Sequence, residues 1–376
     1  MFWRGHVAGF SSGRALRREQ AGKSQTMKLP LTHALAALVP AWSFAAPVAA
    51  GPFEDAVAAS AKGDYATALR LLRPLAERGH ADAQFNLGII YLKGHGVPQN
   101  YAESLLWFGK AADQGIADAQ YNLGSMYHDG LGVPQNYAEA SKWFRKAADQ
   151  GLARAQHNLG VLYREGHGVQ QNDAEALKWF HMAADQGNAS AQDNLGFMYE
   201  NGRGVPQDYA EAAKWYGKAA DQGMSEAQNN LGILYRDGQG VQQNYAKALK
   251  WFHKAADRSD ADPLTQFNFG YMYYNGWGVP KDYVEAAKWF RLAADHGDAR
   301  AQFLLGVMYA ARQGLPQDLV LAYMWVNLAA GHIDDPDAQK NAKNLRDAIA
   351  QGMTPSQITE AQKLAREWKP TTQPPR

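Results

Sequence analysis

Cysteine is absent from all 376 residues of the sequence. Disulfide bridges, thiolate zinc sites and cysteine nucleophiles are therefore excluded. An excess of charge of one sign is also missing, since 38 lysines and arginines stand against 37 aspartates and glutamates. Such a balance gives no long-range field that would attract nucleic acid or an acidic membrane surface. Because 46% of the residues are hydrophobic, the chain can nevertheless bury a substantial core.

Several motifs of hydrolases, zinc proteases and nucleotide-binding proteins are missing as well. The strings S-x-x-K, H-E-x-x-H and G-x-x-x-x-G-K-[ST] do not occur. One G-x-S-x-G string begins at Gly9, but it lacks the preceding strand that a nucleophile elbow requires. The histidines His95 and His167 occupy one loop position two repeats apart, too far for a shared metal ion. We therefore expect no catalytic activity, no cofactor and no metal ion.

A stretch of about 36 residues instead repeats along most of the chain. One glutamine recurs at a step of 36, except for a step of 38 between the fifth and sixth positions. These positions are Gln84, Gln120, Gln156, Gln192, Gln228, Gln266 and Gln302. A fixed period in this range is the signature of a stacked repeat architecture, and the longer step marks a two-residue insertion.

Each repeat has the pattern of two helices joined by a glycine-containing loop. Apolar residues spaced by four and three predict one face of a first helix from Ala81 to Gly94. A second helix is predicted to begin after Asn100, because Asn followed three residues later by Glu103 is typical of a reciprocal capping box. One such hairpin cannot bury both faces of its second helix, so stability must come from neighbouring repeats.

The recurring string A-x-A-Q-x-N-L-G-x-x-Y-x-x-G-x-G-V-x-Q-[ND]-Y-A-E-A-x-K-W-[FY]-x-K-A-A-D-Q-G resembles the Sel-1-like repeat, a relative of the tetratricopeptide repeat. The resemblance covers residues 81–331 in seven repeats. It implies an all-α fold of about eighteen helices, namely a right-handed α/α superhelical solenoid of stacked helix-turn-helix repeats. Such solenoids serve as adaptors or scaffolds for other proteins.

The segments that flank the repeats are predicted to cover the two ends of the stack. Residues 51–80 have the pattern of a degenerate hairpin that caps the N-terminal end. Residues 332–370 are predicted to form a C-terminal helical cap, with helices that begin at Pro336 and after Thr354. The proline-containing tail, residues 371–376, is expected to be mobile.

Residues 1–50 have the pattern of a leader for export. A basic segment is followed by Met27 and Lys28, an apolar run and small residues, which is typical of a secretory signal peptide. We expect translation to begin at Met27 and cleavage to follow Ala45 or Ala50. The mature protein would then have no stable membrane span and would be periplasmic or secreted. A disordered basic leader on a cytoplasmic product and an uncleaved membrane anchor are the alternatives.

Positions that vary between the first helices are expected to form the partner-binding surface, since the recurring positions are used in packing. In tetratricopeptide-like stacks this surface is concave. The sixth repeat differs most, with three aromatic residues spaced by four and three and a tryptophan in the following loop. The predicted partner-binding residues are Phe267, Tyr271, Tyr274, Trp277, Arg164, Arg236, Tyr121 and His157.

These residues have two interpretations each. Aromatic clusters are typical anchor sites for a bound peptide or helix, but the same rings would also fill a gap opened by the two-residue insertion. Arg164 and Arg236 flank Asp193 and Glu200 along the chain, and together they either give a partner a polar register or form a solvated face.

The sequence thus predicts a non-catalytic scaffold or adaptor of the bacterial envelope, monomeric, that binds an unidentified protein. The first alternative is a cell-wall or polysaccharide binder in which Trp277 and the tyrosines stack on sugars. A β-lactamase-like hydrolase is the third possibility, because some secreted proteins with such repeats are described as penicillin binders. Those relatives staple each hairpin with cysteines, which this chain lacks.

Overall fold

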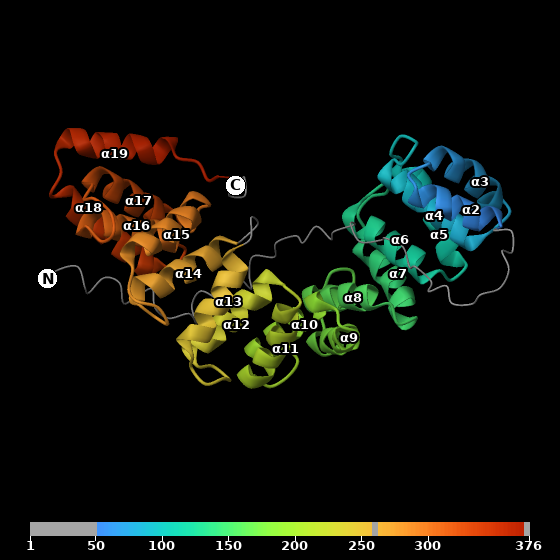
Figure 1. Ribbon diagram of the computed structural model, residues 1–376, viewed down its shortest axis with the longest axis horizontal. Coiled ribbons are helices and arrows are strands. Elements are labelled where there is room, and N and C mark those ends of the chain that lie inside the picture. The colour runs from blue at the N-terminus through green and yellow to red at the C-terminus, as the bar shows by residue number, and fades with distance from the viewer. Residues whose placement is uncertain (1–50, 258–261, 372–376) are drawn as a thin grey trace. The chain divides into compact units, whose positions relative to one another are not determined.

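The computed structural model describes residues 51–257 and 262–371, and within these ranges it contains 18 α-helices and no strand (Figure 1). The predicted leader and signal peptide, and the last five residues of the predicted tail, lie outside the described residues. The expectation of an all-α chain of paired helices is confirmed. None of the described helices is long and apolar enough to cross a membrane.

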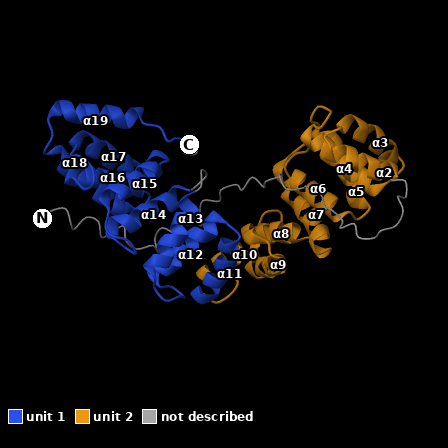
Figure 2. Ribbon diagram, viewed as in Figure 1, with its two compact units in different colours: residues 1–25, 208–376 blue, residues 26–207 orange. Residues whose placement is uncertain are grey.

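The chain divides into two compact units, coloured separately in Figure 2, with the division between residues 207 and 208. The helices of unit 2, orange in Figure 2, are α2 (Pro52–Ala61), α3 (Tyr65–Glu77), α4 (Ala81–Lys93), α5 (Tyr101–Asp113), α6 (Ala117–Asp129), α7 (Tyr137–Asp149), α8 (Ala153–Glu165), α9 (Asp173–Asp185) and α10 (Ala189–Asn201). Those of unit 1, blue in Figure 2, are α11 (Tyr209–Asp221), α12 (Ser225–Asp237), α13 (Tyr245–Ala256), α14 (Pro263–Asn275), α15 (Tyr283–Asp295), α16 (Ala299–Ala311), α17 (Leu319–His332), α18 (Pro336–Ala350) and α19 (Pro355–Glu367).

Glycine ends six of the seven first helices of the repeats. Gly94, for example, has φ of 69°, and its left-handed conformation closes α4 with a backbone hydrogen bond to Ile90. A residue without Cβ adopts this conformation at little cost, which is why the sequence pattern located these ends correctly. The seventh first helix ends instead at Arg312, with φ of 56°.

The second helices begin at Asn or Asp, as predicted, but the reciprocal capping box was wrong for them. The Asn136 side chain accepts a hydrogen bond from the backbone N–H of Glu139 at the start of α7. The Glu139 carboxylate does not return to the cap and forms an ion pair with Lys142 instead. The side chains of Glu139 and Lys142 are exposed on the helix surface, where an ion pair between residues three apart is favourable. In the described residues the full capping box occurs at Thr354 and Gln357, before α19.

The repeating glutamine forms a buried hydrogen bond to the second helix of the preceding hairpin. This bond is made by Gln84, Gln120, Gln156, Gln192, Gln228 and Gln302. Gln156 donates to the carbonyl of Ala148 at the end of α7, at 3.2 Å, and is 1% exposed. Its own Oε1 accepts from Gln186 at the end of α9, at 2.8 Å. The same pattern is present at Gln84 and Gln120. This side chain recurs because the end of each second helix needs a buried polar partner for its last carbonyls.

Replacing Gln156 by methionine is expected to lower the free energy of unfolding by about 1–3 kcal/mol. The change keeps the length of the side chain but leaves the Ala148 carbonyl and the Gln186 amide without this partner. Urea denaturation followed by circular dichroism measures the effect. Gln171→Met is the control, because Gln171 makes a comparable bond to the Arg164 carbonyl while exposed to water. An equal loss in both variants would contradict a special role for the buried link.

The loop of each repeat docks on the second helix of the preceding repeat. Gly168, in the loop between α8 and α9, lies so close to the backbone of Tyr137 that a Cβ would be 2.2 Å from the Tyr137 carbonyl carbon. The neighbouring His167 ring stacks on the Tyr137 ring at 4.8 Å between centroids. The second glycine of the G-x-G-V pattern is therefore a packing contact between repeats.

Candidate functional site

The four aromatic residues predicted as a partner site lie together on α14 and its following loop. We call Phe267, Tyr271, Tyr274 and Trp277 the α14 aromatic cluster. Tyr271 stacks on Phe267 at 5.6 Å and on Tyr274 at 6.4 Å, and its ring meets Trp277 edge to face at 5.4 Å. A continuous row of rings follows, as the spacing of four and three predicted.

The members of the α14 aromatic cluster differ in exposure. Phe267 is only 5% exposed, and the guanidinium of Arg300 lies 4.5 Å above its ring. Tyr271, Tyr274 and Trp277 are half-buried. Burial raises the pKa of Tyr271, and that of Tyr274 to about 12, so both hydroxyls are protonated donors at neutral pH. The cluster therefore contains three half-buried rings, two of which carry hydroxyl groups.

Packing uses part of the same cluster. The Trp277 indole stacks almost parallel on Tyr245 at 5.2 Å, in the same way that His95 stacks on Tyr65. Its position therefore belongs to the loop contact that joins successive repeats. Because Tyr245 occupies one face of the indole, the structure gives no added support to a sugar stacking on Trp277. The packing interpretation thus accounts for Phe267 and for one face of Trp277.

The predicted arginines are engaged in the stack of first helices. Arg164 donates to the side-chain oxygen of Asn194 on the next first helix and forms an ion pair with Glu165. Arg236 is arranged alike, with Asn268 at 3.4 Å and Asp237 at 2.7 Å. Both guanidinium groups are thus oriented by neighbouring repeats.

Of the remaining two predicted residues, the structure leaves only one at the surface. Tyr121 is half-buried, and Arg154 lies 4.6 Å above its ring. His157 is 5% exposed, and so the structure does not present it to a partner. The reason is that Asn194 of the next first helix and Phe180 of α9 lie against the His157 ring. The sequence pattern had placed this position on an open surface. His157 and Phe267 are corrected to interior residues.

Polar contacts that the sequence pattern did not predict connect neighbouring first helices. His157 Nδ1 lies 3.1 Å from Asn158 Oδ1, and its Nε2 lies 3.2 Å from the amide nitrogen of Asn194. In unit 1, Asn268 donates to Asn229 at 2.9 Å. The recurrence of asparagine two residues after the repeating glutamine was visible in the sequence, but only the stack shows that these amides connect adjacent repeats.

The chemistry of this surface is that of contact recognition. Among the residues that the structure describes, no group of three or more histidines and carboxylates could hold a metal ion. Tyrosine and tryptophan are among the side chains that most often dominate the binding energy of protein interfaces, because they bury large areas with few rotatable bonds.

Comparison with known proteins supports the repeat assignment. The model of the Sel1 repeat matches seven segments, residues 81–116, 117–152, 153–188, 189–224, 225–260, 263–298 and 299–331. A Sel1 repeat protein from Oxalobacter formigenes is 33% identical, with 64% of this chain and 98% of that chain covered and a TM-score of 0.60. A protective antigen of uropathogenic Escherichia coli strains, which displays an SLR fold, is 29% identical over 84% of each chain, with a TM-score of 0.44. No curated protein matches the sequence significantly.

Proposed function

This chain belongs to the Sel1 repeat family, and we propose that it is a scaffold that holds a segment of a partner protein on the α14 aromatic cluster. Sel1 repeat proteins generally mediate protein–protein interactions, and the fold is an all-α solenoid of the tetratricopeptide-like type. The observation that supports the choice of site is the row of half-buried rings formed by Tyr271, Tyr274 and Trp277. An interface core needs such large side chains that are already ordered before the partner binds.

The surroundings of the cluster support a directional contact. The Tyr274 hydroxyl donates to Gln313 at 3.2 Å, which fixes the ring against the loop that follows α16. Tyr274 also meets Tyr283 of α15 edge to face at 5.3 Å. Because these contacts restrict the side-chain rotamers, a partner loses little further entropy when it packs on the rings.

We also propose that the protein acts in the bacterial envelope after export. The support is the basic, apolar and small-residue pattern of residues 1–50, which precedes the first hairpin. Crosslinking in the native cell, followed by purification from the periplasmic fraction and mass spectrometry, reports the mature N-terminus together with the bound protein. A full-length product in the cytoplasm would contradict export. Absence of any crosslinked protein would contradict the scaffold.

Exchanging the two tyrosines for residues found at the same positions in other repeats is expected to reduce partner capture at least tenfold. Tyr271→Ile introduces the residue type that Ile89 and Ile233 have at the equivalent position. Tyr274→Leu introduces the residue type that Leu92 has at its equivalent position. The double variant should therefore fold while it loses two rings and two hydroxyls, and we expect at least a tenfold loss of crosslinked partner, or about 1.4 kcal/mol.

The matched control is Phe197→Ile, at the position of Tyr271 two repeats earlier. It should retain the partner, and circular dichroism should show both variants fully helical. Equal capture by the double variant and the control would show that the α14 aromatic cluster is packing alone.

A further inference from the structure

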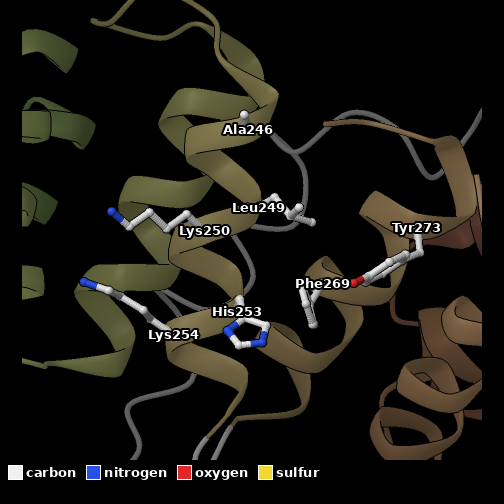
Figure 3. A pocket seen from close by; sticks show the side chains of 7 residues that line it. All are labelled: Ala246, Leu249, Lys250, His253, Lys254, Phe269 and Tyr273. Atoms are coloured by element: carbon white, nitrogen blue, oxygen red, sulfur yellow. The ribbon is translucent and has the colours of Figure 1, made fainter. Parts of the chain in front are cut away.

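A second surface of the unit that contains α14 is a cavity of about 400 Å³ between α13 and α14 (Figure 3). Leu249 and His253 reach into it from α13, and Phe269 and Tyr273 from α14. The latter two lie on the face of α14 opposite to Tyr271, because residues two apart on a helix point in nearly opposite directions. Tyr271 and Tyr274 of the α14 aromatic cluster therefore do not line the cavity.

The cavity lies at a place that a side-chain hydrogen bond closes at three other repeat junctions. At three junctions, a basic side chain of a second helix bonds to the hydroxyl of the tyrosine 18 residues later: Arg73 to Tyr91, Arg145 to Tyr163 and His181 to Tyr199. His253 and Tyr273 occupy the equivalent positions, but the two-residue insertion separates them by 20 residues. The His253 ring instead meets Phe269 edge to face at 5.4 Å. The space that this hydrogen bond fills at those three junctions belongs to the cavity here.

Positive charge borders this cavity along α13. The helix carries Lys247, Lys250 and Lys254 besides His253, and no aspartate or glutamate. All four are exposed, and Lys250 and Lys254 extend from the flank of α13 away from Phe269 and Tyr273 (Figure 3). The apolar hollow is thus bordered, on one flank of α13, by the ammonium groups of Lys250 and Lys254.

We propose that this cavity binds an aromatic side chain of a protein segment whose flanking residues are acidic. The hollow has the volume of small-ligand sites, and its walls are a leucine, a phenylalanine, a tyrosine and an imidazole. An aromatic ring packs favourably edge to face against such walls. Lys250 and Lys254, on one flank of α13, attract the carboxylates of the segment that lie on that side of the ring, which sets the direction of the segment and speeds encounter.

The test uses the full chain and a fluorescein-labelled heptapeptide with a central tryptophan between two runs of three acidic residues. Fluorescence anisotropy should show saturable binding that weakens as salt is raised. The double variant Lys250→Glu with Lys254→Glu should bind at least about tenfold more weakly. His253→Arg gives the junction the side chain that Arg145 provides elsewhere, and it removes no positive charge from α13. It should close the cavity and therefore also bind about tenfold more weakly.

Two controls separate this site from general attraction and from the proposed function. Lys178 is the equivalent of Lys250 at the junction that His181 and Tyr199 close. The Lys178→Glu variant should bind the peptide as tightly as the native chain does. The double variant of the α14 aromatic cluster should also bind normally. The proposal is wrong if the native chain does not bind the peptide, if alanine replaces the peptide tryptophan without loss, or if His253→Arg binds as well as the native chain.

Discussion

Replacing Gly168 by alanine is expected to lower the free energy of unfolding by about 3–5 kcal/mol, a loss large enough to open the neighbouring repeats. Gly168 has φ of 70°, which an alanine adopts only with strain. The added Cβ would also meet the Tyr137 carbonyl carbon at 2.2 Å and the Ala138 nitrogen at 2.4 Å. These atoms belong to the first turn of α7, so the loop must move off that helix and lose the stacking of His167 on Tyr137.

Gly151→Ala is the matched control for this prediction. Gly151 follows α7, has φ of 87° and has no atom within 4 Å of an added Cβ. It carries the left-handed strain without the clash, and so it should lose only about 1–2 kcal/mol. Urea denaturation gives the size of each loss. Because repeat arrays depart from two-state unfolding, amide hydrogen exchange over α7 to α9 should be measured beside it. Similar losses in both variants would show that the loop tolerates a side chain against α7.

Acidification from pH 6.5 to pH 4 is expected to destabilise the unit that contains α8 by about 3 kcal/mol through one side chain. Burial lowers the pKa of His157 from 6.5 to about 4, and the nearby charge of Arg164 acts in the same direction, while the bond to Asn158 opposes them. The neighbouring amides explain why the neutral ring fits. Nδ1 donates to Asn158, and Nε2 accepts from the Asn194 amide, whose oxygen is held by Arg164.

The sign follows from the two pKa values. Above pH 6.5 the imidazole is neutral in both the folded and the unfolded chain, and its contribution does not change with pH. Between pH 6.5 and about 4 the unfolded chain binds a proton that the folded chain rejects, so stability falls as the pH falls. Below about pH 4 both states are protonated and the full loss is present.

His157→Phe should remove most of this dependence, since Phe85 and Phe303 occupy the same position in other repeats. Urea midpoints at pH 7 and at pH 4.5 should differ much less in this variant than in the native chain. The difference between the two proteins isolates this residue from the carboxylates, which titrate in both. If both proteins lose the same stability, His157 does not titrate as a buried group.

Much of the architecture could be predicted from the chain because it depends on local patterns. The step between glutamines defined the repeats, apolar residues at spacings of three and four defined the helices, and glycine or asparagine marked their ends. Thr354 and Pro355 likewise begin α19 as expected. The reciprocal capping box at Glu139 failed because an exposed carboxylate has several partners of nearly equal free energy, and Lys142 was the better one.

The sequence by itself determined the period, the two helices of each repeat, the insertion before Gln266 and the grouping of aromatic residues in the sixth repeat. These features depend on contacts within a few residues and on backbone conformations that glycine permits. Only the tertiary structure decided that His157 and Phe267 are buried while Tyr271 and Tyr274 stay half-buried at neighbouring positions. The physical reason is that burial here is set by the side chains of the adjacent repeat, which lie 30 to 40 residues away along the chain. The cavity at His253 has the same origin, because a two-residue insertion changes the fit between helices without changing the pattern of either helix.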